Sequence, residues 1–150
     1  MNQKKLISLL ATGFGAGLSP KMPGTVGTLA AIPLWYLLYL TGPYAYMVIT
    51  FFLVIAAIFI SDAYEKDLPS HDRPEIVIDE IVGFLITMTW LPFSLTYLVL
   101  GFVLFRVLDI WKPYPIRYLN DKVRGGFGVV IDDVAAGLIA NIILQLVTQH

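Results

Sequence analysis

Cysteine is absent from this chain of 150 residues, and only two histidines are present. The lack of cysteine excludes a disulfide scaffold, a thiolate nucleophile and a cysteine-ligated metal. Charge is also scarce: 14% of the residues are charged and 57% are hydrophobic, whereas average globular chains are roughly one quarter charged. So few charges cannot cover an apolar interior with a solvated surface, so we expect a membrane protein. A net charge of -1 gives no indication of nucleic-acid binding.

The hydrophobic residues gather in three stretches without any charged side chain, at residues 22–61, 81–105 and 134–149. The first is about twice the roughly 20 residues that a helix needs to cross a hydrocarbon core. Because Thr41-Gly42-Pro43-Tyr44 interrupts it, we predict a helical hairpin with arms of about Thr28 to Leu40 and Tyr44 to Ile60. Aromatic residues around its turn are expected to form an interfacial belt, and these are Trp35, Tyr36, Tyr39, Tyr44 and Tyr46.

The second stretch allows two interpretations, one span kinked at Pro92 or a second hairpin. A single span would leave the acids before it and the charges after it on opposite sides of the bilayer. A hairpin with helices of about Ile76 to Leu91 and Phe93 to Trp111 places every charge on one face. We therefore predict the hairpin.

A last helix is expected from about Val130 to Val147. The predicted fold class is all-α, a compact multi-pass membrane bundle of about five apolar helices, with two hairpins and a C-terminal helix in a single domain over residues 1–150. Residues 1–21, 62–80 and 106–133 then share one side and hold all ten Lys and Arg, so that side is cytoplasmic by the positive-inside rule. Whether residues 6–18 span, re-enter or lie at the interface stays open.

Five carboxylates border these apolar stretches on the same predicted side. Asp79 and Glu80 begin one helix, Asp109 ends the next, and Asp132 and Asp133 begin the last. Acids at one depth repel one another in a low dielectric unless cations neutralise them. Oxygen ligands without cysteine favour Mg²⁺ over zinc or copper. We therefore predict that these five residues bind the metal and carry the catalysis.

Each acid taken alone also has an ordinary structural explanation. Acids in the first turn of a helix are favoured by the helix dipole. Asp109 can pair with Arg106 or Lys112 at a spacing of three residues.

Basic and glycine-rich segments beside the acids are candidates for binding phosphate. Residues 19–28 and 125–128 each lead into an expected helix, where free N–H groups and the helix dipole can hold an anion. Glycine-rich loops also occur for geometry alone, and the basic residues 106–124 are also explained by contact with anionic lipids. The phosphate-binding candidates are Lys21, Thr25, Arg106, Lys112, Gly125 and Gly126.

Several catalytic motifs are missing, including Gly-x-Ser-x-Gly, the Walker A motif and His-Glu-x-x-His. His71 is the one internal histidine, which excludes a phosphohistidine route that needs a second histidine, and we interpret it as a loop residue. What is left is a metal-carboxylate cluster beside phosphate-binding loops at a membrane surface. That combination suits metal-assisted attack on a phosphate.

Four motifs combine these features in a fixed order: GAGLSPKMPGTVGT at 15–28, IDEIVG at 78–83, FRVLDIWKPYPI at 105–116 and GGFGVVIDDVAAG at 125–137. Through them the chain resembles the phosphatidylglycerophosphatase A family over nearly its whole length. The resemblance implies a bacterial inner-membrane, Mg²⁺-dependent phosphatase that converts the phospholipid phosphatidylglycerophosphate to phosphatidylglycerol and inorganic phosphate. It also implies an all-helical fold whose helices pack around a central one.

The candidate residues and the family resemblance lead to one mechanistic hypothesis. In it, water attacks phosphorus with the help of Mg²⁺, and the basic candidate side chains neutralise phosphate oxygens. A covalent aspartyl-phosphate is a second route, although no local motif favours it. The alternatives from other classes are a small cation- or proton-coupled transporter and a non-catalytic membrane scaffold. Besides membrane lipid, a homo-oligomeric partner stays open.

Overall fold

The computed structural model describes residues 3–66 and 73–148, and His71 lies outside the described residues. Within them the chain is all-helical, as predicted, with seven α-helices, one short 3-10 helix and no strand. The elements are α1 (Gln3–Ala11), η1 (Ala16–Leu18), α2 (Pro23–Tyr39), α3 (Pro43–Glu65), α4 (Ile78–Thr87), α5 (Leu95–Trp111), α6 (Ile116–Lys122) and α7 (Gly125–Thr148).

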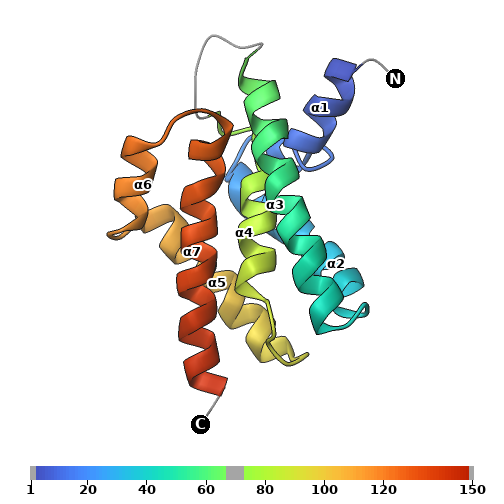
Figure 1. The fold of residues 1–150 in the computed structure, drawn as a ribbon, viewed down its shortest axis with the longest axis vertical. Helices are drawn as coiled ribbons and strands as arrows, with labels where there is room; N and C mark the ends of the chain where they lie inside the picture. The colour runs from blue at the N-terminus through green and yellow to red at the C-terminus, as the bar shows by residue number, and fades with distance from the viewer. Residues whose placement is uncertain (1–2, 67–72, 149–150) are drawn as a thin grey trace.

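Short turns join α2 to α3 and α4 to α5, so both predicted hairpins are present. Gly42 forms the turn between α2 and α3, because its φ of 88° is not helical. Pro43 then begins α3, where its missing N–H costs nothing. Ser94 begins α5, because its side chain accepts a hydrogen bond from the Thr96 N–H at 3.2 Å. Both turns and the end of α7 lie at one end of the molecule, and α1 and α6 lie toward the other (Figure 1).

The helix boundaries differ from the prediction where glycine and proline were read as loop residues. α2 begins at Pro23 and α7 at Gly125, so all of residues 23–28 and 125–128 are helical. α4 has only 10 residues, about 15 Å at 1.5 Å per residue. The nine-residue α1 is likewise too short to cross a hydrocarbon core. Of the described helices, α3 and α7 are long and apolar enough to span one.

The short helix α4 is central, because α2, α3, α5 and α7 all pack against it. Its side chains Phe84 and Leu85 are fully buried, together with Phe105 of α5. The surrounding helices therefore share one core around α4, as the resemblance implies.

Close contact between α4 and α7 depends on two glycines. A Cβ on Gly137 would lie 2.4 Å from the Gly83 carbonyl oxygen, and one on Gly83 would lie 2.9 Å from the Asp133 carbonyl oxygen. One turn further along α7, the Asn141 amide donates hydrogen bonds to the carbonyls of Thr87 (2.9 Å) and Thr89 (2.8 Å). The face of α7 that carries Gly137 and Asn141 is thus held directly against α4.

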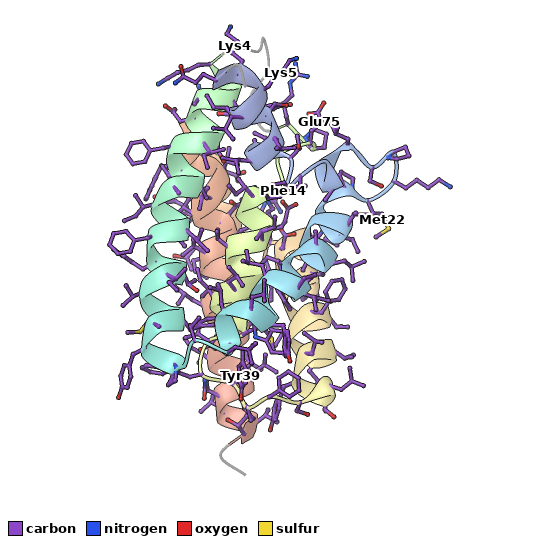
Figure 2. The ribbon with its side chains drawn as sticks, turned by 90° about the vertical axis from the view of Figure 1, so that its right-hand side faces the viewer. Lys4, Lys5, Phe14, Met22, Tyr39 and Glu75 are labelled. Atoms are coloured by element: carbon purple, nitrogen blue, oxygen red, sulfur yellow. The ribbon has the colours of Figure 1, made fainter. Side chains whose placement is uncertain are left out.

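The aromatic residues near the hairpin turns are only partly a surface belt. Figure 2 shows Tyr39 at the end of the molecule opposite Lys4 and Lys5. Trp35 is buried and stacks on Phe93 with ring centroids 5.7 Å apart. Tyr46 is a core residue rather than a belt residue, because its hydroxyl donates to the Leu85 carbonyl at 2.6 Å. An apolar core can hold a tyrosine when its hydroxyl finds such an acceptor.

The contact at Gly137 generates a prediction about stability. Gly137→Ala would stabilise an exposed helix by about 1 kcal/mol, but here the added methyl group would meet the backbone of α4. We expect a net loss of about 1–3 kcal/mol from overpacking. Thermal unfolding in detergent should show a melting temperature several degrees lower, at about 2–4 °C per kcal/mol.

Leu138→Ala is the control, because the neighbouring Leu138 side chain on α7 is 51% exposed. It should leave the melting temperature nearly unchanged. An unchanged or higher melting temperature for Gly137→Ala would contradict the tight packing of the two helices.

Candidate metal and phosphate site

All five predicted acids meet at one small cavity, which we call the acidic cavity. Asp79 and Glu80 are in the first turn of α4, and Asp109 is in the last turn of α5. Asp132 and Asp133 lie about two turns into α7 rather than at its start. The acidic cavity has a volume of about 90 Å³ and is lined by Arg73, Pro74, Ile76, Asp79, Glu80, Asp109, Lys112, Val129, Asp132 and Asp133.

Three of the acids are close enough together to share a cation. One carboxylate oxygen each from Asp79, Glu80 and Asp133 lies within 4.8 Å of the other two. The contact at Gly83 and Gly137 produces this arrangement, because each glycine lies four residues after an acid on its own helix. Side chains four residues apart share a helix face. Asp79 and Asp133 are thus brought together by the packing of α4 on α7.

Not every oxygen of the five carboxylates has a hydrogen-bond donor in the described part of the chain. Asp79 Oδ1, Glu80 Oε2 and Asp132 Oδ1 are buried and make no hydrogen bond within the described part of the chain. Buried oxygens without donors fit a hard cation, which prefers oxygen ligands.

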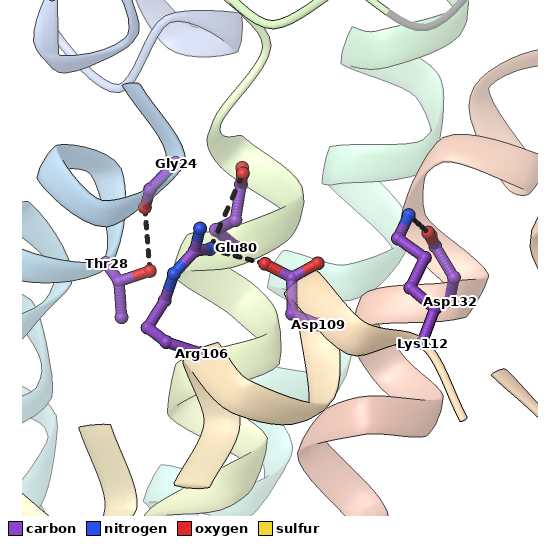
Figure 3. A network of polar contacts seen from close by, with 7 residues as sticks. All are labelled: Gly24, Thr28, Glu80, Arg106, Asp109, Lys112 and Asp132. Carbon is purple, nitrogen blue, oxygen red and sulfur yellow. Dashed lines mark hydrogen bonds and ion pairs between the residues drawn. The ribbon is translucent and has the colours of Figure 1, made fainter. Parts of the chain in front are cut away.

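Two basic side chains from α5 neutralise the outer acids (Figure 3). Arg106 forms an ion pair with Asp109 and lies 3.8 Å from Glu80, measured from Nη1 to Oε1. Lys112 contacts Asp132, and it ends α5 in a left-handed conformation with φ of 45° just before Pro113. Burial would lower the pKa of Lys112, but its contact with Asp132 raises the pKa on balance.

The glycine-rich start of α2 makes room for this network. A Cβ on Gly24 would lie 2.2 Å from Glu80 Oε1 and 3.0 Å from Arg106 Nη2. The Gly24 carbonyl accepts a hydrogen bond from the Thr28 hydroxyl at 2.8 Å, within α2 (Figure 3). At Gly24 the motif therefore serves close approach.

Of the six predicted phosphate-binding residues, only Lys112 lines the acidic cavity, and Arg106 contacts its acids Asp109 and Glu80 from outside that lining. Lys21 is exposed, and Thr25 lines a separate apolar groove between α2 and α5. Gly125 and Gly126 belong to α7, and a Cβ on Gly126 would lie 2.2 Å from the Ile58 carbonyl oxygen of α3. Gly126 therefore permits α7 to pack closely on α3, and Gly125 allows the positive φ of 74° with which α7 begins.

Sequence reasoning missed Arg73, which lines the acidic cavity beside Lys112. Its Nη1 lies 3.8 Å from Glu75 Oε1, while its buried Nε makes no hydrogen bond among the described residues. The only signal in the sequence is a basic residue just before the Asp79 motif.

Comparison of the sequence with known proteins identifies a family. The family model described as Phosphatidylglycerophosphatase A matches residues 9–148. The chain is 43% identical to Phosphatidylglycerophosphatase A of Escherichia coli (strain K12), over 95% of this chain and 83% of that protein. It is 40% identical to the Haemophilus influenzae protein of the same name, over 92% of this chain and 86% of that protein.

A third relative carries a different lipid name. The Bacteroides thetaiotaomicron protein named "Putative phosphatidylinositol-3-phosphatase" is 37% identical, over 92% of this chain and 91% of that protein. No solved structure matches the chain significantly. The family model and the two relatives that share its name each extend over nearly the whole chain, and the chain therefore belongs to the phosphatidylglycerophosphatase A family.

Proposed function

We propose that this protein removes the terminal phosphate of phosphatidylglycerophosphate, giving phosphatidylglycerol and inorganic phosphate. Membership of the phosphatidylglycerophosphatase A family supports the substrate and the reaction. The observation that carries the mechanism is the meeting of five carboxylates from α4, α5 and α7 at the acidic cavity, with Lys112 and Arg73 on its wall. Acids and bases at one small cavity suit a divalent cation and the phosphate that it binds.

Mg²⁺ is the proposed cofactor, held by Asp79, Glu80 and Asp133, with Asp109 and Asp132 beside them. The fit rests on the unpartnered oxygens of Asp79 and Glu80 and on the spacing of the three carboxylates. When bound, Mg²⁺ would supply a Lewis acid that neutralises phosphate charge and makes water a stronger nucleophile.

The basic side chains are proposed to bind the phosphate. Lys112 acts as a point charge, and the guanidinium groups of Arg73 and Arg106 offer paired N–H donors. The contacts of Arg106 with Asp109 and Glu80 hold its head in place. A positioned donor costs less to order when substrate binds than a mobile one.

The acidic cavity is proposed to lie at the cytoplasmic boundary of the bacterial inner membrane. From Asp132 to the end of α7 at Thr148 is about 24 Å at 1.5 Å per residue, and this length carries only one further charged residue, Asp133. That is most of the roughly 30 Å of a hydrocarbon core. The helices of the two hairpins would then form a multi-pass bundle with α7, with α3 as the other long span.

The whole chain is proposed to act as one domain. Its largest core cluster takes buried residues from α2, α3, α4, α5, α6 and α7. A second, smaller cluster of Ala57, Val82 and Val130 joins α3, α4 and α7, which also belong to the first, so the acids from three helices depend on shared packing.

The first prediction from the proposed function concerns activity. Asp79→Asn, Asp109→Asn and Asp132→Asn should each lower Mg²⁺-dependent phosphate release by about 100-fold or more, because even outer partners of metal ligands are worth about 10–100-fold. The assay measures inorganic phosphate from phosphatidylglycerophosphate in detergent micelles, with Mg²⁺ or with a chelator.

Asp121→Asn is the matched control, because Asp121 is an exposed acid on α6 whose carboxylate lies 4.0 Å from Arg117. Full activity in all three cavity variants would refute the proposed site. A wild-type protein that binds Mg²⁺ but releases phosphate from no lipid would favour the transporter, and one that does neither would favour the scaffold.

The second prediction concerns stability and needs no substrate. Asp79→Asn removes one buried acid from a crowded group, so the metal-free variant should melt a few degrees above the metal-free wild type. Added Mg²⁺ should raise the melting temperature of the wild type, because a ligand that binds only the folded state stabilises it. The variant should lose most of that rise. Equal shifts with Mg²⁺ in both proteins would contradict the metal site.

The third prediction concerns topology and uses the absence of native cysteine. Tyr44 is 77% exposed at the first hairpin turn, and Asp121 is exposed on α6. A membrane-impermeant thiol reagent should label Tyr44→Cys in spheroplasts and Asp121→Cys only after permeabilisation. The opposite pattern would place the acidic cavity on the outer face.

A further inference from the structure

An apolar groove runs along α5 beside the start of α2, and we call it the lateral groove. It has a volume of about 410 Å³, within the usual range for ligand pockets of roughly 300–1,000 Å³. Val103, Val107 and Ile110 recur at helical spacing on its wall, which also includes Met22 and Trp111. These side chains are about half exposed or more, with Trp111 at 76%. Figure 2 shows Met22 at the outside of the molecule, where α2 begins.

Arg106 connects the lateral groove to the acidic cavity. Among the described residues it is the one charged side chain on the groove wall, and its guanidinium contacts Asp109 and Glu80 of the acidic cavity. Its Nε is buried and makes no hydrogen bond among the described residues. One side chain therefore separates an apolar surface from an acidic, phosphate-suited cavity, and it carries an unused donor.

The ligand that matches an apolar groove, a cation and a phosphate-suited cavity in this order is a lipid with an anionic head group. Its phosphate monoester would lie in the acidic cavity, its more apolar part along α5, and an anionic oxygen between them would accept from Arg106. A cation next to an apolar surface suits such a ligand, because each part of it meets a group of matching polarity. A wholly apolar partner would leave the Arg106 donor without an acceptor.

We propose that the lateral groove binds an acyl chain of the lipid substrate and so fixes the position of the phosphate in the acidic cavity. This inference rests on the proposed function, because it takes the lipid phosphate as substrate. From Val103 to Ile110 the groove wall extends about 10 Å along α5, enough to hold the part of the chain nearest the glycerol. Holding that part costs little in a bilayer, since the chain exchanges one apolar neighbour for another, and it orients the head group.

The test fills the groove without making it polar. Val107→Trp puts a large apolar side chain into the lateral groove, at a residue that is 48% exposed. Val48→Trp is the matched control, because Val48 on α3 is 50% exposed and does not line the groove. Both variants are assayed on diacyl phosphatidylglycerophosphate in mixed micelles and on its water-soluble deacylated form.

Val107→Trp should raise KM and lower kcat/KM for the diacyl substrate by about tenfold or more, in the range that apolar pockets discriminate. Its kcat/KM for the deacylated substrate should stay within about twofold of the wild type, and Val48→Trp should change neither value. Equal loss on both substrates, or no loss on either, would overturn the groove assignment. Failure of the wild type to release phosphate from either substrate would instead refute the proposed function.

Photo-crosslinking gives a second measurement that does not depend on turnover of the deacylated form. A lipid phosphate with a photoreactive acyl chain should mark peptides of α5 between Val103 and Trp111, and unlabelled substrate should compete. Phosphatidylcholine with the same chain should show no such competition. Equal marking of α3 and α5, or crosslinks between two copies of the protein in place of lipid adducts, would overturn the proposal.

Discussion

The structure depends on keeping several buried carboxylates next to one another. Asp79, Glu80 and Asp133 are within reach of a single cation. One buried oxygen each of Asp79 and Glu80 has no hydrogen-bond donor in the described part of the chain, so its charge is not compensated there. Two features make this tolerable. Arg106 and Lys112 pair with the outer acids, and the inner three are arranged as ligands for a hard ion. Stability and activity therefore compete at the same residues.

Helix packing, rather than a loop, determines where the acids lie. Gly83 and Gly137 bring α4 and α7 into backbone contact, and Gly24 lets α2 approach Glu80 and Arg106. Sites built on helices hold their side chains more tightly than sites on loops. For a hydrolase that must hold a lipid phosphate beside acids, such rigidity limits how far the charges can separate when the cation is absent.

Much of the fold could be predicted because charge marks helix ends in an apolar chain. The gaps between charged residues indicated both hairpins, and the acids at the edges of the apolar stretches indicated which helix ends meet. The boundary errors involve glycine. Residues 24 and 126 were expected in loops, whereas both lie in helices at points where a Cβ would meet a neighbouring element. Arg73 was missed because only tertiary packing brings it to the acidic cavity.

The early end of α4 has a consequence of its own. A helix that stops inside an apolar layer exposes carbonyl groups that no water can reach. Here the amides of Asn141 and Gln145 donate to the carbonyls of Thr87 and Thr89, so α7 closes the end of its neighbour. The carbonyls at the end of α4 are thereby paired although the helix has only 10 residues. Two amide side chains of α7 thus complete the end of a short buried helix whose first turn carries Asp79 and Glu80.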